Sequence, residues 1–185
     1  MGQPRIISGK ARGIRLLPVP GDSTRPVTDR VKEALFNILS TDIVDATFLD
    51  LFGGTGSIGI EALSRDAQSC LFLEINSKAV ATIKENLQRT HTADAARVLQ
   101  IDALKYLAST QNTSFDYIYV APPQYKGIWE KAMHLIDNNM NHLSEDGWVI
   151  VQIHPIEYLN LELTNLVEFD QRKYGSTLLI FYERK

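Results

Sequence analysis

The sequence has very little cysteine and no long hydrophobic run. Cys70 is the only cysteine in the 185 residues, so the chain cannot form an internal disulfide, as is usual in a reducing compartment. No apolar stretch is long enough to span a bilayer, and the basic N-terminal segment lacks the apolar core of a secretory signal. We therefore expect a cytoplasmic protein that does not enter a membrane.

Histidines are also few and scattered. His91, His134, His142 and His154 show none of the short spacings of metal-ligand motifs, so we expect surface or hydrogen-bonded histidines and no metal. Hydrophobic residues make up 44% of the chain and charged residues 22%, which is ordinary for a globular domain with a substantial core.

The net charge of −3 argues weakly against a nucleic-acid partner, but the charge is unevenly distributed. The first 40 residues carry a net charge of +4, which leaves −7 on the remainder. A basic segment on an acidic body can bind a phosphate backbone. It can equally be a solvated segment with incidental charge, and the charge pattern alone does not separate these two interpretations.

Residues 47–65, TFLDLFGGTGSIGIEALSR, are the stretch around which the chain is organised. They predict a short apolar strand, a glycine-rich turn and the start of a helix. Glycines in the turn allow a sharp bend and close approach of the backbone to a ligand. A helix that begins directly after such a turn points free N–H groups at whatever the turn holds.

Strands and helices are predicted to alternate after this turn. Apolar runs typical of strands recur along the chain, at residues 48–51, 70–73, 97–101, 115–120 and 148–153. Segments with helical periodicity lie between them, at about 58–65, 78–89, 104–107 and 128–142. This alternation predicts an α/β fold, in which helices cover both faces of a parallel sheet.

The two ends of the chain lack this alternation. Residues 5–26 have glycines and prolines between short apolar pieces, which predicts an extended or hairpin arm. From Thr28 or Asp29, either of which can cap a helix, apolar residues recur at helical spacing as far as Leu39. Strand-like runs at 166–169 and 177–182, joined across residues 170–176, predict a terminal antiparallel hairpin.

Two nucleotide-like ligands fit the glycine turn. Residues 54–59, GTGSIG, match G-x-G-x-x-G, and Glu74 follows Gly54 by 20 residues, as in dinucleotide-binding sites. Asp50 closes the preceding strand, however, and a carboxylate repels a pyrophosphate in a partly dry site. The same carboxylate attracts the ammonium and sulfonium groups of S-adenosylmethionine. We therefore favour S-adenosylmethionine, with a nicotinamide-dependent oxidoreductase as an alternative.

Carboxylates close three successive predicted strands, at Asp50, Glu74 and Asp102. Ligands of doubly wound sheets bind beyond the carboxyl ends of the strands. Glu74 is placed to accept the ribose hydroxyls, and Asp102 to accept the adenine amino group beside the Ala103 N–H. Each acid could instead be a turn residue or a helix cap, but three acids in phase with three strands favour a nucleoside site.

The fourth predicted strand is followed by Ala121-Pro122-Pro123-Gln124-Tyr125. Proline fixes φ and has no N–H, which leaves nearby carbonyls without a local donor. Such carbonyls, together with a side-chain oxygen, can hold the two hydrogens of an exocyclic amine. Tyr125 can stack on a base that has left its helix. We predict that these five residues form the catalytic part of the site.

Four blocks of the sequence resemble one known family in their order along the chain. They are RIISGKARGIRLL, RPVTDRVKEALFNIL, LDLFGGTGSIGIEALSR and the proline pair. The chain is similar to bacterial small-subunit ribosomal RNA guanine-N2 methyltransferases of the RsmD type. The resemblance implies a Rossmann-like class I methyltransferase with a seven-stranded, mostly parallel sheet whose last strand is antiparallel. It also implies an RNA-facing extension at residues 1–40 before a methyltransferase domain at 41–185.

The resemblance also implies site residues. It places the cofactor, S-adenosyl-L-methionine, against the ends of the first three strands, at Asp50, Phe52, Gly53, Gly54, Gly56, Glu74, Ile75, Asp102 and Ala103. It places RNA against the basic segment, at Arg5, Lys10, Arg12, Arg15, Arg25, Thr28 and Arg30. The expected partner is small-subunit ribosomal RNA, either free or in an assembling 30S particle.

One departure concerns the proline motif. The family usually has D/N-P-P-F/Y, whereas this chain has Ala121 first and Gln124 before Tyr125. Losing one acceptor costs about 1–3 kcal/mol, or about 5- to 150-fold in rate if it all falls on the transition state. We expect the Gln124 amide oxygen to replace it and activity to be retained. The alternative is a catalytically silent RNA-binding or ribosome-assembly protein.

Overall fold

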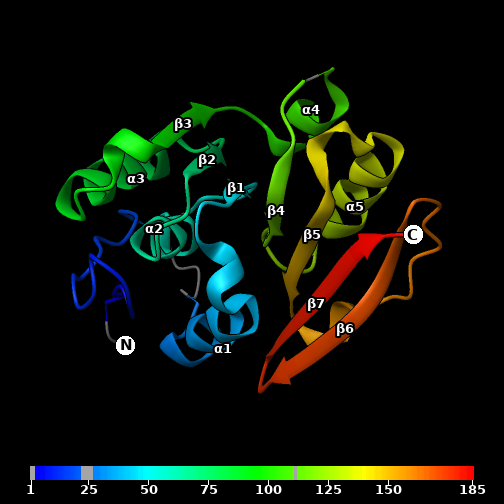
Figure 1. Ribbon diagram of the computed structural model, residues 1–185, viewed down its shortest axis with the longest axis horizontal. Coiled ribbons are helices and arrows are strands. Elements are labelled where there is room, and N and C mark those ends of the chain that lie inside the picture. The colour runs from blue at the N-terminus through cyan, green and yellow to red at the C-terminus, as the bar shows by residue number, and fades with distance from the viewer. Residues whose placement is uncertain (1–2, 22–26, 111) are drawn as a thin grey trace.

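The computed structural model describes residues 3–21, 27–110 and 112–185. Its centre is a seven-stranded sheet in the order β3-β2-β1-β4-β5-β7-β6 (Figure 1). The strands are β1 Thr47–Asp50, β2 Ser69–Glu74, β3 Ala96–Gln100, β4 Phe115–Val120, β5 Leu143–Ile153, β6 Leu166–Tyr174 and β7 Thr177–Arg184. β7 pairs antiparallel with β5 and β6, and the other pairs are parallel. The predicted sheet with its antiparallel last strand is confirmed.

Helices cover both faces of the sheet (Figure 1). One face packs against α1 Asp29–Leu39, α2 Ser57–Ser64 and α3 Ser77–Arg89. The other face packs against α4 Ala103–Ala108 and α5 Ile128–Asn138. Short 3₁₀ turns complete the described elements, η1 Ser40–Ile43, η2 Ala93–Ala95, η3 Met140–His142 and η4 Pro155–Glu157. Because both faces are covered, consecutive residues of the central strands β1 and β4 are buried rather than alternating between buried and exposed.

Local sequence explains where α1 begins. The Thr28 hydroxyl accepts the Val31 N–H at 3.3 Å, and Asp29 places a negative charge in the first turn. Val31, Leu35 and Leu39 are buried at helical spacing, and each contributes about 1.5–3 kcal/mol by leaving water. The predicted N-terminal helix is therefore confirmed.

The glycine turn bends the chain from β1 into α2. Gly54 and Gly56 have φ values of +55° and +79°, which only glycine adopts readily. Gly59, in α2, lies against β2 so closely that a Cβ there would be 2.3 Å from a ring carbon of Phe72. The turn therefore needs glycine for backbone conformation, and α2 needs it for packing.

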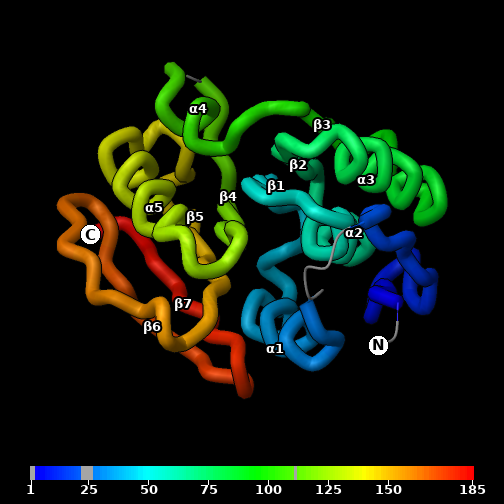
Figure 2. Tube along the Cα trace, turned by 180° about the vertical axis from the view of Figure 1, so that it is seen from behind, coloured from blue at the N-terminus to red at the C-terminus, as the bar shows by residue number. Residues whose placement is uncertain are grey.

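The described part of the arm is a short hairpin that packs onto the body. Arg5 and Arg15 form an antiparallel bridge, and the Ile6 N–H donates to the Ile14 carbonyl at 2.9 Å. Ile6 and Leu16 are buried in the same core cluster as α1 and α2. Figures 1 and 2 both show this segment, in dark blue, beside α2 and α3. The division at residue 40 stays a prediction.

Two predicted boundaries on the carboxyl half were wrong. α5 ends at Asn138 rather than residue 142, and β5 begins at Leu143 rather than Trp148. Gly147, directly before the predicted strand at 148–153, lies inside β5. A Cβ at Gly147 would be 3.0 Å from the carbonyl oxygens of β4, so glycine is needed there for close approach of the two strands.

The terminal hairpin is longer than predicted. β6 extends to Tyr174, so only Gly175 and Ser176 connect it to β7, and Gly175 has a φ of +60°. The connection was predicted at residues 170–176, but its polar residues 170–173 belong to β6. They are polar because β6 is the edge of the sheet, where Asp170 and Arg172 form an exposed ion pair at 2.9 Å.

Candidate active site

Three predicted carboxylates lie along the carboxyl edge of the sheet. Asp50 is the last residue of β1, Glu74 is the last residue of β2, and Asp102 follows β3. The Ile101 N–H donates to the Glu74 carbonyl at 3.1 Å, and this hydrogen bond joins the carboxyl ends of β2 and β3. Because β1, β2 and β3 are parallel neighbours, the three acids occupy consecutive strand ends, as the sequence predicts.

Asp50 is the most buried of the three, with only 2% of its surface exposed. Its Oδ1 atom has no hydrogen-bond partner among the residues that the structure describes. Burial raises the pKa of Asp50 to about 7, although the N–H groups of Gly59 and Phe52 act in the opposite direction. The nearby Glu74 charge adds to the rise. A positively charged ligand group would stabilise this carboxylate.

Glu74 and Asp102 already make contacts within the protein. Glu74 accepts the N–H groups of Gly54 and Asn76, at 3.0 and 2.8 Å, and so ties the glycine turn to the start of α3. Asp102 caps α4 by accepting the N–H groups of Leu104 and Lys105 through Oδ1. A carboxylate has about four acceptor sites, so these contacts leave capacity for a ligand. Their roles in cofactor binding stay predictions.

The remaining predicted cofactor residues surround these acids. The Gly53 N–H donates to the Leu73 carbonyl at 2.9 Å, which fixes the turn against β2. Phe52 is partly buried, and Ala103 is buried as the first residue of α4. The Ile75 side chain is 64% exposed beside Glu74 and offers an apolar surface at this edge.

Residues Ala121 to Tyr125, which are predicted to accept the hydrogens of the substrate amine, form the acceptor segment. This segment lies next to the carboxyl edge of the sheet that carries the three acids. β4 pairs with β1 so that Tyr119 is opposite Asp50, and Ala121 begins the segment two residues further on. Pro122 is buried, Ala121 is partly buried, and Gln124 is exposed. The Tyr125 side chain is 66% exposed, so its ring is available for stacking.

Sequence reasoning missed two residues that hold this segment. The Tyr125 N–H donates to Glu157 at 2.7 Å, and the Tyr125 ring lies 5.8 Å from the ring of His154. Glu157 and His154 form a reciprocal cap on η4, with Pro155 at the first position. Proline followed two residues later by glutamate is a helix-start signal directly after β5 and could have identified this cap, but not its contact with Tyr125.

The predicted RNA-binding residues divide into two groups. Arg5 pairs with Asp29 and Lys10 pairs with Asp66, in exposed ion pairs. The other described members of this set are exposed and have no ion-pair partner among the described carboxylates, at Arg12, Arg15 and Arg30. Arg25 lies outside the described residues. The Thr28 hydroxyl caps α1, so its role at RNA stays a prediction.

Metal-ligand clusters and membrane-spanning helices are both absent from the part of the chain that the structure describes. Within residues 3–21, 27–110 and 112–185, no three His, Cys, Asp or Glu side chains converge where they could hold a metal ion. None of the helices in these ranges is both long and apolar enough to cross a membrane.

The strand order, the antiparallel β7 and the glycine turn after β1 define a class I methyltransferase fold. The family described as "Conserved hypothetical protein 95" matches residues 4–183. The chain belongs to this family, which includes ribosomal RNA small subunit methyltransferase D. Membership removes support from the nicotinamide-dependent alternative.

Individual relatives cover most of the chain. Ribosomal RNA small subunit methyltransferase D of Escherichia coli is 40% identical over 152 residues, which are 82% of this chain and 75% of the relative. YlbH of Bacillus subtilis is 36% identical over 183 residues, which are 98% and 99% of the two chains. The solved structure of yhhF from Escherichia coli is 35% identical, with a TM-score of 0.87 and coverage of 100% and 99%.

S-adenosylmethionine is the cofactor of this fold and family, and the residues present fit it. Asp50 offers the ammonium group a buried carboxylate with an orphaned oxygen. The charged residues that close β1, β2 and β3 are Asp50, Glu74 and Asp102, and these carboxylates disfavour a phosphate group. The site therefore suits an uncharged nucleoside with a cationic end.

Proposed function

We propose that this protein transfers a methyl group from S-adenosylmethionine to the exocyclic N2 amine of a guanine in small-subunit ribosomal RNA. The observation that carries the proposal is the buried Asp50 oxygen, which has no partner among the described residues, next to the acceptor segment with its exposed Tyr125 ring. The first feature suits the cationic methyl donor, and the second suits a base that has left its stack. The names of the relatives support ribosomal RNA as the substrate.

Each part of the site has a defined task in this proposal. When bound, the cofactor supplies a methyl group that its sulfonium already activates. Asp50 binds the ammonium group, Glu74 binds ribose hydroxyls, and Asp102 binds the adenine edge. The Ala121 and Pro122 carbonyls, together with the Gln124 amide oxygen, accept the two hydrogens of the guanine amine. Positioning then supplies most of the rate, and the amine loses its proton after methyl transfer.

Ribosomal RNA from a strain without this protein, incubated with purified protein and labelled S-adenosylmethionine, tests the proposal. The expected product is one N2-methylguanine, located by mass spectrometry of RNA fragments. Free RNA and 30S particles are compared as separate substrates. Gln124→Ala is expected to lower the rate by about 5- to 150-fold if the amide oxygen replaces the missing acceptor. Methylation of another atom, or none, would contradict the proposal.

Ala121 and the exposure of Gln124 favour one other candidate, a catalytically silent RNA-binding or ribosome-assembly protein. Mass mapping of ribosomal RNA from strains with and without the protein separates the two. An unchanged modification pattern supports the silent protein. A guanine that loses its methyl group supports the enzyme.

A further inference from the structure

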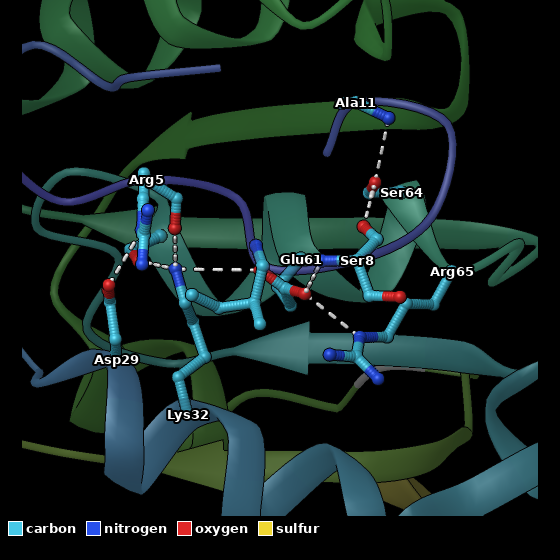
Figure 3. Close-up of polar contacts among 10 residues, drawn as sticks. Arg5, Ser8, Ala11, Asp29, Lys32, Glu61, Ser64 and Arg65 are labelled. Atoms are coloured by element: carbon cyan, nitrogen blue, oxygen red, sulfur yellow. Dashed lines mark hydrogen bonds and ion pairs between the residues drawn. The ribbon is translucent and has the colours of Figure 1, made fainter. Parts of the chain in front are cut away.

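A fully buried glutamate on α2 holds the N-terminal arm through its main chain. Glu61 is 0% exposed and accepts the N–H groups of Ile7 and Ser8, at 2.8 and 3.0 Å (Figure 3). It also accepts the Arg65 guanidinium at 2.9 Å and lies 3.5 Å from the Lys32 ammonium. One carboxylate thus accepts three hydrogen bonds, two of them from consecutive arm residues, and forms an ion pair with Lys32.

Lys32 connects the same cluster to the arm and to the glycine turn. Its ammonium donates to the Arg5 carbonyl (Figure 3). It also donates to the Ser57 hydroxyl, at 3.0 Å. Ser57 is the first residue of α2, directly after Gly56. Burial lowers the pKa of Lys32, although the Glu61 charge acts in the opposite direction. Removing one partner of such a buried pair leaves an uncompensated charge.

A second contact fixes the bend of the arm against the end of α2. The Lys10 N–H donates to the Ser64 carbonyl at 2.8 Å, and the Ser64 hydroxyl bridges the Ala11 N–H and the Ser8 carbonyl. Gly9 has a φ of +82°, and a Cβ there would be 1.8 Å from the Ser64 carbonyl oxygen. Only glycine allows the arm to lie this close.

We propose that the arm binds RNA as a rigid, preformed element, and that Glu61 is the positioning residue that holds it. The inference rests on the proposed function, since it concerns how the enzyme recognises RNA. The clamped loop carries Arg12 and Arg15, which are exposed and have no ion-pair partner among the described residues. A flexible arm would lose conformational entropy on binding, whereas a clamped arm has lost it on folding.

Two variants release the arm by independent means. Glu61→Gln keeps the shape of the side chain but removes its charge. One carboxylate oxygen becomes an NH₂ group, which cannot accept a hydrogen bond, so one of the two arm N–H groups loses its acceptor. Gly9→Ala leaves every charge in place and introduces the clash with Ser64. The matched controls are Glu33→Gln, an exposed residue of α1, and Gly13→Ala. Gly13 has nearly the same φ, +84°, but an added methyl group there would meet no atom within 4 Å, so this control measures backbone strain alone.

The first readout is arm release in the isolated protein. Trypsin cleavage after Arg12 or Arg15 is expected to accelerate about 10- to 100-fold in both test variants. The cause is the lost charge-assisted hydrogen bond in Glu61→Gln and the clash with Ser64 in Gly9→Ala. The second readout is kinetic. The KM for RNA is expected to rise about 5- to 10-fold, while kcat and the Kd for S-adenosylhomocysteine stay within about twofold of the wild type.

The outcomes separate this inference from the proposed function. If trypsin cleaves the arm of both variants no faster than that of the wild type, Glu61 does not hold the arm and the inference fails. It fails also if the arm is released while the KM for RNA is unchanged. If the wild type methylates no RNA, the proposed function fails, and the RNA Kd from filter binding replaces the KM as the test of arm positioning.

Discussion

The Glu157 carboxylate accepts the Tyr125 backbone N–H at 2.7 Å, although 32 residues separate the two in the chain. The same carboxylate accepts the His154 N–H at 3.2 Å, so it joins the segment after β4 to the turn after β5. Tyr125 has a φ of +62°, which is unfavourable for a residue with a side chain. The Glu157 contact therefore stabilises a strained backbone where the acceptor base is expected to bind.

Replacing Glu157 with alanine is expected to slow methyl transfer without affecting cofactor binding. The lost charge-assisted hydrogen bond lets Tyr125 relax out of its left-handed conformation, which we expect to lower kcat about tenfold. Single-turnover transfer to RNA and calorimetry with S-adenosylhomocysteine measure the two quantities. Glu162→Ala, an exposed acidic residue in the loop between η4 and β6, is the control. A loss of cofactor affinity equal to the loss of rate would contradict this role.

Cofactor affinity is expected to depend on pH through Asp50. Its pKa is raised to about 7 in the free protein, mainly by burial. The cofactor ammonium binds the ionised carboxylate, so binding releases a proton below this pH. The Kd is expected to rise about tenfold from pH 8 to pH 6. Calorimetry in two buffers of different ionisation enthalpy measures the released proton, and Asp50→Asn is expected to remove the dependence.

The ionised Asp50 carboxylate is expected to favour cofactor binding but to lower the stability of the fold. The folded-state pKa of Asp50 is above its unfolded value of 3.8, so its contribution to stability is present at low pH and is lost as pH rises through about 7. Asp50→Asn should therefore increase the free energy of unfolding at pH 8 relative to the wild type, and less so at pH 5. Urea unfolding at both pH values tests this. A variant that loses stability at pH 8 would contradict the assignment of Asp50 as a destabilised carboxylate.

Asn86 links the arm to the glycine turn and is expected to affect both. Its side chain is buried, accepts the Leu17 N–H at 2.7 Å, and donates to the carbonyls of Leu17 and Thr55. Asn86→Asp keeps the acceptor and removes both donors, so we expect a loss of about 1–3 kcal/mol in the free energy of unfolding. We also expect weaker binding of S-adenosylhomocysteine, because the Thr55 carbonyl is part of the turn.

Gln88→Glu is the matched control for Asn86→Asp, since it makes the same amide-to-acid change on the exposed face of α3. Urea unfolding and calorimetry are run on both variants. Equal effects of the two substitutions would show that the added charge, rather than the lost contact with Leu17 and Thr55, is responsible.

What the sequence could predict was local or periodic. The apolar runs located the strands, and the acids at their ends, such as Asp50 and Glu74, followed from parallel strands meeting at one edge. Contacts such as Glu157 with Tyr125 depend on two distant turns meeting, which no local pattern encodes. The start of β5 was predicted too late for a similar reason, because Gly147 continues the strand through close packing against β4, which is a non-local contact.

The packing of α2 on β2 is expected to control both stability and the Asp50 site. A Cβ on Gly59 would lie 2.3 Å from Phe72 and 2.6 Å from the Cys70 sulfur, so Gly59→Ala must push the helix outward. We expect it to cost about 1–3 kcal/mol of unfolding free energy, which urea unfolding measures. The Gly59 N–H lowers the pKa of Asp50, so this displacement should also raise that pKa and weaken cofactor binding at pH 7.

A compensating substitution tests whether the clash with Phe72 causes the loss of stability and cofactor affinity in the Gly59→Ala variant. Phe72→Leu removes the ring atoms that the new methyl group would meet, so the double variant is expected to recover part of the lost stability and cofactor affinity. Recovery of both together would mean that the position of α2 sets the environment of Asp50. Recovery of stability alone would show that the Gly59 N–H does not act on the Asp50 carboxylate. In that case α2 would have regained its position on β2 without restoring cofactor affinity.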